Sequence, residues 1–173
     1  MKLPYILFLA LTFCFCGSAN FHLEEQLKIE TFVKGVYDVP RDGTGNTFFM
    51  IGLKLKNISD STVEFLTMTC TTGSNLVFDS NQVEPVINNC ASNYATPIVL
   101  KQNQEFDFTF LLKADKSYPD KLKIGWIILT KENTHSVDKY FDYLHKFREN
   151  LENVIWANPI ELYCCAFNQF EIK

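Results

Sequence analysis

The sequence predicts an all-β fold: an immunoglobulin-like antiparallel β-sandwich with one amphipathic helix inserted before the last strand. Apolar and polar residues alternate with a period of two along several short segments, which is typical of strands with one buried face. Turn signals separate roughly six to eight such segments, a spacing that favours a two-sheet sandwich. Sixteen phenylalanines supply the flat, bulky side chains that such a core packs. With 47% hydrophobic and 21% charged residues, the composition is that of one globular domain, which we assign to residues 20–173.

Residues 1–19 have the pattern of a secretory signal peptide. Lys2 precedes the apolar run Leu3–Phe15, and the small residues Gly17 to Ala19 predict cleavage before Asn20. The run is shorter than the ~20 residues that a spanning helix needs. A lipid-modified cysteine at the start of a mature lipoprotein is the alternative for Cys14 or Cys16, against which the preceding bulky phenylalanines argue. The expected localisation is therefore secreted or periplasmic, in the cell envelope, with a lipid anchor as the alternative.

The first predicted strand, Leu27–Val39, places apolar residues on one parity, and the glycine-containing segment 40–46 is a loop. Two further strands follow within Asn46–Cys70. A polar turn at Asn57–Ser61 separates them, and the pattern predicts that they form a hairpin. The buried side of the first of these strands consists of alternating apolar residues, namely Phe49, Ile51, Leu53 and Leu55.

The second half begins after the irregular stretch 71–96. Residues 97–100 predict an edge strand because proline is tolerated at the first position of a strand. Residues 105–113 give the clearest alternation, with Phe106, Phe108, Phe110 and Leu112 directed inward. Residues 121–130 carry apolar side chains on both faces, including Trp126, which indicates a central strand.

The period then changes from two to between three and four over Val137–Leu151, which predicts an amphipathic helix with Ser136 as its N-cap. Strand character returns over Val154–Leu162, where Asn158-Pro159 favours a bulge or an edge position. The tail 163–173 receives no assignment.

Four cysteines remain after signal cleavage: Cys70, Cys90, Cys164 and Cys165. Export makes disulfides plausible, and we predict a Cys70–Cys90 disulfide. It would close a loop of about 20 residues, which stabilises the folded state by roughly 3 kcal/mol in the chain-entropy model. A bond between the neighbours Cys164 and Cys165 is strained, so we expect one of them to be a buried, inert thiol.

Three groups of residues resemble one known family. They are the turn Lys56–Ser61, the succession Met68–Cys70, Cys90–Asn93 and Pro97–Lys101, and the closing segment Val154–Ile160. Together they are similar to an uncharacterised family of small exported or lipid-anchored bacterial immunoglobulin-like proteins, over roughly residues 27–162. The resemblance implies a β-sandwich and a cell-envelope address. It implies no activity and no catalytic or ligand-binding position.

The residues do not predict an enzyme. His22, His135 and His145 lack the local spacing of a metal site, and Glu24, Glu25, Asp79 and Glu84 lack that of a calcium loop. We therefore predict no catalytic residue, no cofactor and no metal. A cysteine-dependent hydrolase or redox protein, using Cys164 or Cys165 with a histidine, is one alternative. A carbohydrate-binding module is another, and it would use exposed rings among Tyr94, Tyr118, Tyr140, Tyr143 and Tyr163.

The net charge of the mature chain limits the classes of partner that we expect. The full chain has a net charge of −4, and cleavage removes Lys2 and no acidic residue, which leaves fifteen basic and twenty acidic residues, a charge of −5. Such a domain has no electrostatic footprint for nucleic acid or anionic lipid. Asn57-Ile58-Ser59 is formally a glycosylation sequon in a eukaryotic source, and is equally a plain turn. We expect a noncatalytic interaction or accessory module of the cell envelope that binds a protein or glycan.

Overall fold

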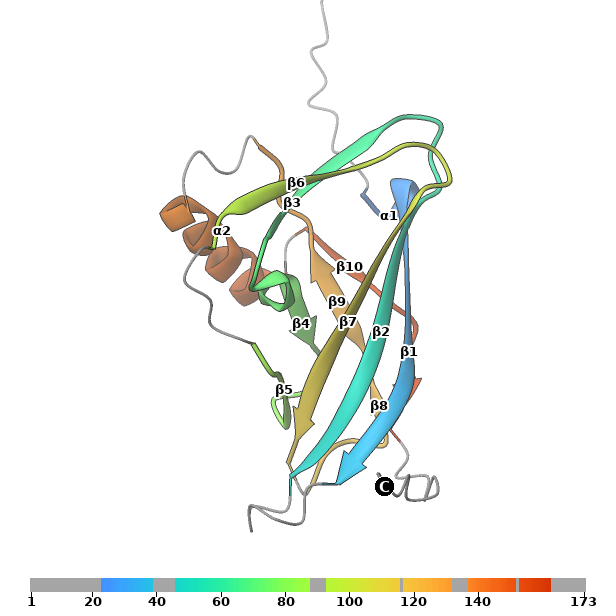
Figure 1. The fold of residues 1–173 in the computed structure, drawn as a ribbon, viewed down its shortest axis with the longest axis vertical. Helices are drawn as coiled ribbons and strands as arrows, with labels where there is room; N and C mark the ends of the chain where they lie inside the picture. The colour runs from blue at the N-terminus through green and yellow to red at the C-terminus, as the bar shows by residue number, and fades with distance from the viewer. Residues whose placement is uncertain are drawn as a thin grey trace, which may run out of the picture.

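A computed structural model describes residues 23–38, 46–87, 93–115, 117–131, 137–151 and 153–162. Eleven strands, two α-helices and a 3₁₀ helix follow one another within these ranges (Figure 1). Their bounds are α1 (Leu23–Gln26), β1 (Leu27–Asp38), β2 (Thr47–Asn57), β3 (Val63–Met68), η2 (Thr72–Asn75), β4 (Leu76–Phe78), β5 (Val83–Pro85), β6 (Ala95–Leu100), β7 (Glu105–Ala114), β8 (Lys121–Leu122), β9 (Ile124–Ile127), α2 (Val137–Asn150), β10 (Val154–Trp156) and β11 (Ile160–Glu161).

The largest sheet has the strand order β1-β2-β7-β5, and every pairing in it is antiparallel. The predicted alternation decides which face is buried, because successive side chains in a strand point to opposite faces. The inward residues of β2, from Phe49 to Leu55, are at most 1% exposed. The pairing of β1 with β2 shifts register between Val33 and Gly35, which marks a bulge in β1.

The predicted hairpin within Asn46–Cys70 is wrong. Both edges of β2 are already paired, with β1 and β7, and β3 instead pairs with β6. The chain therefore turns a corner after Asn57 and crosses from one sheet to the other, and β6 and β7 turn the same corner in the opposite direction. Figure 1 shows β3 and β6 leaning away from β2 and β7 toward α2.

The second layer contains the sheet β10-β9-β4 and the pair β3-β6. A backbone hydrogen bond of 2.7 Å from Leu66 N in β3 to Leu129 O, just beyond the end of β9, joins the two. Strand β9 is buried on both faces, as its sequence predicts. Trp126 faces the core between the sheets, whereas Ile127 packs against α2 in a second cluster with Tyr140, Leu144 and other apolar side chains.

These observations confirm the predicted fold class: a mostly β, antiparallel, two-layered domain whose main helix comes late in the chain. Helix α2 lies almost where its period of three to four residues predicts it. Two short strands follow it in place of one, because Asn158-Pro159 separates β10 from β11, and β11 pairs with β8. The single turn of α1 is an addition that the sequence did not predict.

Candidate functional site

The solvent-facing side of the large sheet carries a set of alternating charges, which we call the ionic ladder. Its members come from three neighbouring strands, and register alone brings them together, since Lys28 pairs with Lys56 and Glu30 with Lys54 across β1 and β2. The corresponding partners on β7 are Glu105 and Asp107. The ladder consists of Lys28, Glu30, Lys54, Lys56, Glu105 and Asp107.

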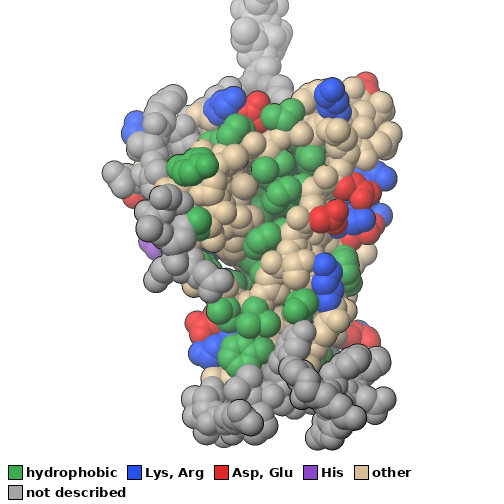
Figure 2. Space-filling model, viewed as in Figure 1, with side chains coloured by type: hydrophobic (Ala, Val, Ile, Leu, Met, Phe, Trp, Pro, Cys, Tyr) green, Lys and Arg blue, Asp and Glu red, His purple; other side chains and the backbone are tan. Residues whose placement is uncertain are grey.

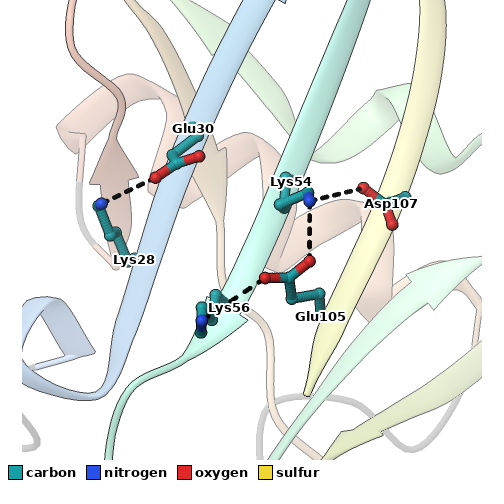
Figure 3. A network of polar contacts seen from close by, with 6 residues as sticks. All are labelled: Lys28, Glu30, Lys54, Lys56, Glu105 and Asp107. Atoms are coloured by element: carbon teal, nitrogen blue, oxygen red, sulfur yellow. Dashed lines mark ion pairs between the residues drawn. The ribbon is translucent and has the colours of Figure 1, made fainter. Parts of the chain in front are cut away.

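Lys54 is the centre of the ladder (Figure 3). Its Nζ lies 2.8 Å from Glu105 Oε2 and 4.0 Å from Asp107 Oδ1. Lys56 Nζ lies 3.6 Å from the other oxygen of Glu105, and Lys28 pairs with Glu30 at 2.7 Å. Solvent screens such exposed pairs, so they fix positions more than they stabilise the fold.

The charges shift the pKa values of three ladder members, Glu30, Lys54 and Glu105, each in the direction that keeps the group ionised. The hydrogen bond from Lys54, together with the charges of Lys54 and Lys56, lowers the pKa of Glu105. The same hydrogen bond and the nearby carboxylates raise the pKa of Lys54. The hydrogen bond and charge of Lys28 lower the pKa of Glu30. The ladder is consequently a fixed pattern of both signs around neutral pH.

An aromatic ring lies beside the ladder. Phe32 pairs with Gly52 across β1 and β2, and its ring covers the glycine so closely that a Cβ there would lie 2.6 Å from the ring. Lys34 Nζ lies 5.6 Å from the centre of the same ring and donates a hydrogen bond of 2.7 Å to Thr109 Oγ1. Despite this cover, Phe32 is 44% exposed.

A recess of about 320 Å³ opens at the end of the ladder away from Phe32. It is lined by five of the six ladder side chains, all except Asp107, together with Ile58 and Asn103. The lining combines cations, anions and one apolar side chain, which suits polar side chains of a partner better than a simple anion. No group in it has the nucleophile and base arrangement that catalysis requires.

Of the two cysteines in the predicted disulfide, the structure describes only Cys70. Cys70 is disulfide-bonded, whereas Cys90, Cys164 and Cys165 lie outside the described residues. The Cys70–Cys90 pairing therefore stays a prediction. Its neighbourhood agrees with it, because Cys70 N donates to Asn93 Oδ1 at 3.2 Å and Thr69 N to Tyr94 O at 3.1 Å. The end of β3 thus lies beside residues that closely follow Cys90.

The histidines and acidic residues considered for metal binding are dispersed. His145 is exposed on α2 and lies 3.3 Å from Glu149, while His22 and His135 are outside the described residues. Asp79 Oδ1 accepts the Lys123 N–H, and Glu84 pairs with Lys113. Glu25 is exposed on α1 and the side chain of Glu24 is not described. Over the described ranges, no three His, Cys, Asp or Glu side chains are grouped to hold a metal ion.

The tyrosines proposed for glycan binding do not form one exposed surface. Tyr140 is fully buried, and Tyr118 packs edge-on against Phe49 at 5.2 Å. Tyr143 is half-buried against Phe147, whereas Tyr94 is 59% exposed. Tyr163 lies outside the described residues. Among the four of these rings that the structure describes, only Tyr94 is well placed to meet a ligand.

Asn57 is a structural residue at the corner between the sheets. It is 0% exposed, and its Nδ2 donates to Ser61 O at 2.7 Å and to Leu100 O at 2.8 Å. Its Oδ1 accepts from the backbone and the hydroxyl of Ser59. The amide is thus unavailable for glycosylation in the folded protein, and the turn interpretation of the sequon holds.

Neither the ionic ladder nor the role of Phe32 was predicted from the sequence. The outward positions of the charges were predictable from the alternation, but their juxtaposition depends on which strands are neighbours. One local signal was present: a glycine inside a strand, such as Gly52, often marks a close approach by another group.

Comparison with known proteins gives no family. No protein-family model matches the chain, and no curated protein matches it. A crystal structure of a FixG-related protein from Vibrio parahaemolyticus is similar over 65% of this chain and 89% of that one, with 14% identity and a TM-score of 0.34. A similarity this low carries no argument about function. No helix in the described ranges is long and apolar enough to cross a membrane.

Proposed function

We propose that the chain is a noncatalytic, exported interaction module of the cell envelope that binds a partner protein through the outer face of β1, β2 and β7. The observation that carries this proposal is Phe32, a large aromatic ring that is 44% exposed on a rigid sheet. Protein interfaces are enriched in such rings, with polar groups around them that exclude water from the contact.

The surroundings of Phe32 support recognition of a protein. The ionic ladder holds both signs of charge in fixed positions, which favours a partner with the complementary pattern and disfavours others. The ring is also held in place before binding by Gly52 beneath it and Lys34 beside it. Less conformational entropy is therefore lost on association than with a free side chain.

Export is the part of the proposal that depends on residues 1–19, whose pattern predicts a signal peptide, and on the resemblance to exported bacterial sandwich proteins. The proposed location in the cell envelope rests on these two arguments.

The proposal is tested with a photo-crosslinking amino acid in place of Phe32 in the full chain, expressed in the cells from which it comes. Phe141 on α2 is a matched control, because it is also aromatic and 40% exposed. We expect a discrete crosslinked adduct from position 32 and none from position 141. Absence of an adduct at position 32, or the same adducts at both positions, would overturn the proposal.

A further inference from the structure

One edge of β7 is only partly paired. Along its whole length β7 pairs with β2, but on the other side it pairs with β5 only at Leu112–Ala114. The Val86 N–H extends this ladder by one bond, to Leu111 O at 2.8 Å. In antiparallel sheets alternate residues direct their backbone groups to the same neighbour, so Thr109 and Asp107 point the same way as Leu111. No described residue pairs with their backbone groups on that side.

Apolar side chains border this free edge. Phe106 and Phe108 point toward the core but stay half-buried, and their rings lie 6.0 and 5.9 Å from that of the fully buried Trp126. Figure 2 shows hydrophobic side chains gathered along the middle of the face that includes this edge. Where β5 ends, Val86 and Ile87 are 40% and 41% exposed. An added strand at this edge would bury apolar surface as well as pair backbone groups.

We propose that the free edge of β7, from Glu105 to Phe110, accepts an extended segment of the partner protein as an additional strand that continues the line of β5. Main-chain hydrogen bonds to Asp107 and Thr109 supply affinity, and alternate side chains supply specificity. The inference rests on the proposed function, since it names the part of the partner that docks beside the ionic ladder.

The charges of the edge determine the chemistry of this segment. Asp107 is 71% exposed and lies 4.0 Å from Lys54, so its carboxylate is only loosely paired. A lysine or arginine directly opposite it in the added strand is favoured, and an acidic residue is disfavoured. The segment therefore alternates basic residues, on the outer face, with apolar residues that face Phe106 and Phe108.

A second copy of the chain fits this edge poorly. If two β7 edges paired antiparallel about Asp107, the two Asp107 carboxylates would lie opposite each other, and like charges in that position are destabilising. Charged residues on exposed edges commonly prevent such self-association. The edge consequently favours a basic partner strand over a copy of itself.

The test is hydrogen exchange on the purified full chain, with and without a short synthetic peptide in which lysine and valine alternate. We expect the amides of Asp107 and Thr109 to exchange rapidly in the free protein, and the peptide to slow them by at least about tenfold. A control peptide of alternating glutamate and valine should give no protection. Asp107→Lys, at an exposed position, should reverse this preference between the two peptides.

A second pair of variants tests the backbone contact. Thr109→Pro removes an N–H that faces the free edge, so it should abolish protection at Asp107, whereas Thr109→Val should retain it. Three results would overturn the proposal: no protection by the lysine–valine peptide, slow exchange of these amides in the free monomer, or protection that appears only with dimer formation. A crosslink from position 32 without peptide protection would refute the added strand and leave the proposed function standing.

Discussion

Replacement of Asn57 by alanine should destabilise the fold more than any other single change in its exposed turn. The side chain makes four hydrogen bonds, two donated to the carbonyls of Ser61 and Leu100 and two accepted from Ser59. Alanine removes all four. The Leu100 carbonyl is the costly one, because its residue is 4% exposed and Asn57 reaches it from the other side of the corner.

The magnitude follows from these contacts. A typical hydrogen bond contributes about 0.5–1.5 kcal/mol net, and a buried group left without a partner costs about 1–3 kcal/mol. The contacts to Ser59 lie near solvent, where water replaces them, so we expect a loss of roughly 2–4 kcal/mol in the free energy of unfolding. For a domain of this size that lowers the melting temperature by about 5–15 °C.

The assay is urea unfolding followed by tryptophan fluorescence, with Ser61→Ala as the control, since that exposed hydroxyl should be worth less than about 0.5 kcal/mol. Asn57→Asp adds a pH signature. Aspartate keeps the acceptor oxygen but directs a carboxylate oxygen at two carbonyls. The loss in the free energy of unfolding relative to the parent should therefore shrink as the pH falls and the carboxyl is protonated. An Asn57→Ala variant as stable as the parent, or an Asn57→Asp deficit independent of pH, would refute this role.

Four further substitutions test the helix, the glycines and the ladder. Tyr140→Phe, which removes a hydroxyl that donates to a buried amide, should lower the free energy of unfolding by about 1–2 kcal/mol in chemical denaturation. Because burial raises the pKa of Tyr140, its contribution is complete below the ordinary tyrosine pKa and lost as the pH rises through the folded value, and absorbance titration should show it ionising only with unfolding. Gly125→Ala places a Cβ within 2.6 Å of a buried valine and should cost about 1–3 kcal/mol. Gly52→Ala displaces the exposed Phe32 ring and the end of the exposed Lys34 side chain, so it should leave thermal stability nearly unchanged while weakening the crosslink from position 32. Lys54→Met should flatten the acid side of the pH–stability curve, because the lowered pKa of Glu105 gives stability that is present above the ordinary carboxyl pKa and lost as the pH falls through the folded value.

The alternation of residues predicted the faces of the strands well. In β2 and β7 the residues expected to point inward do so, because period two is a property of the extended backbone itself. The position of α2 was equally predictable from its period, and so was the burial of β9 on both faces.

The partners of the strands were not predictable in the same way. Alternation says which side of a strand is apolar, but it does not say which strand lies next to it. The polar turn after β2 resembled a hairpin turn, and the buried contacts of Asn57 that make it a corner depend on Leu100, far along the chain. The ionic ladder was missed for the same reason, since Lys54 and Glu105 meet only through the pairing of β2 with β7.

The most direct test of the proposed binding face is lysine labelling of the full chain in intact envelopes and after purification. Lys28, Lys54 and Lys56 report on the ionic ladder. Lys146 is the control, because it is exposed on α2, outside the proposed binding face. We expect the ladder lysines to be protected in the envelope and to become reactive on purification, while Lys146 reacts equally in both states. Equal reactivity of the ladder lysines in the two states would refute the proposed binding face.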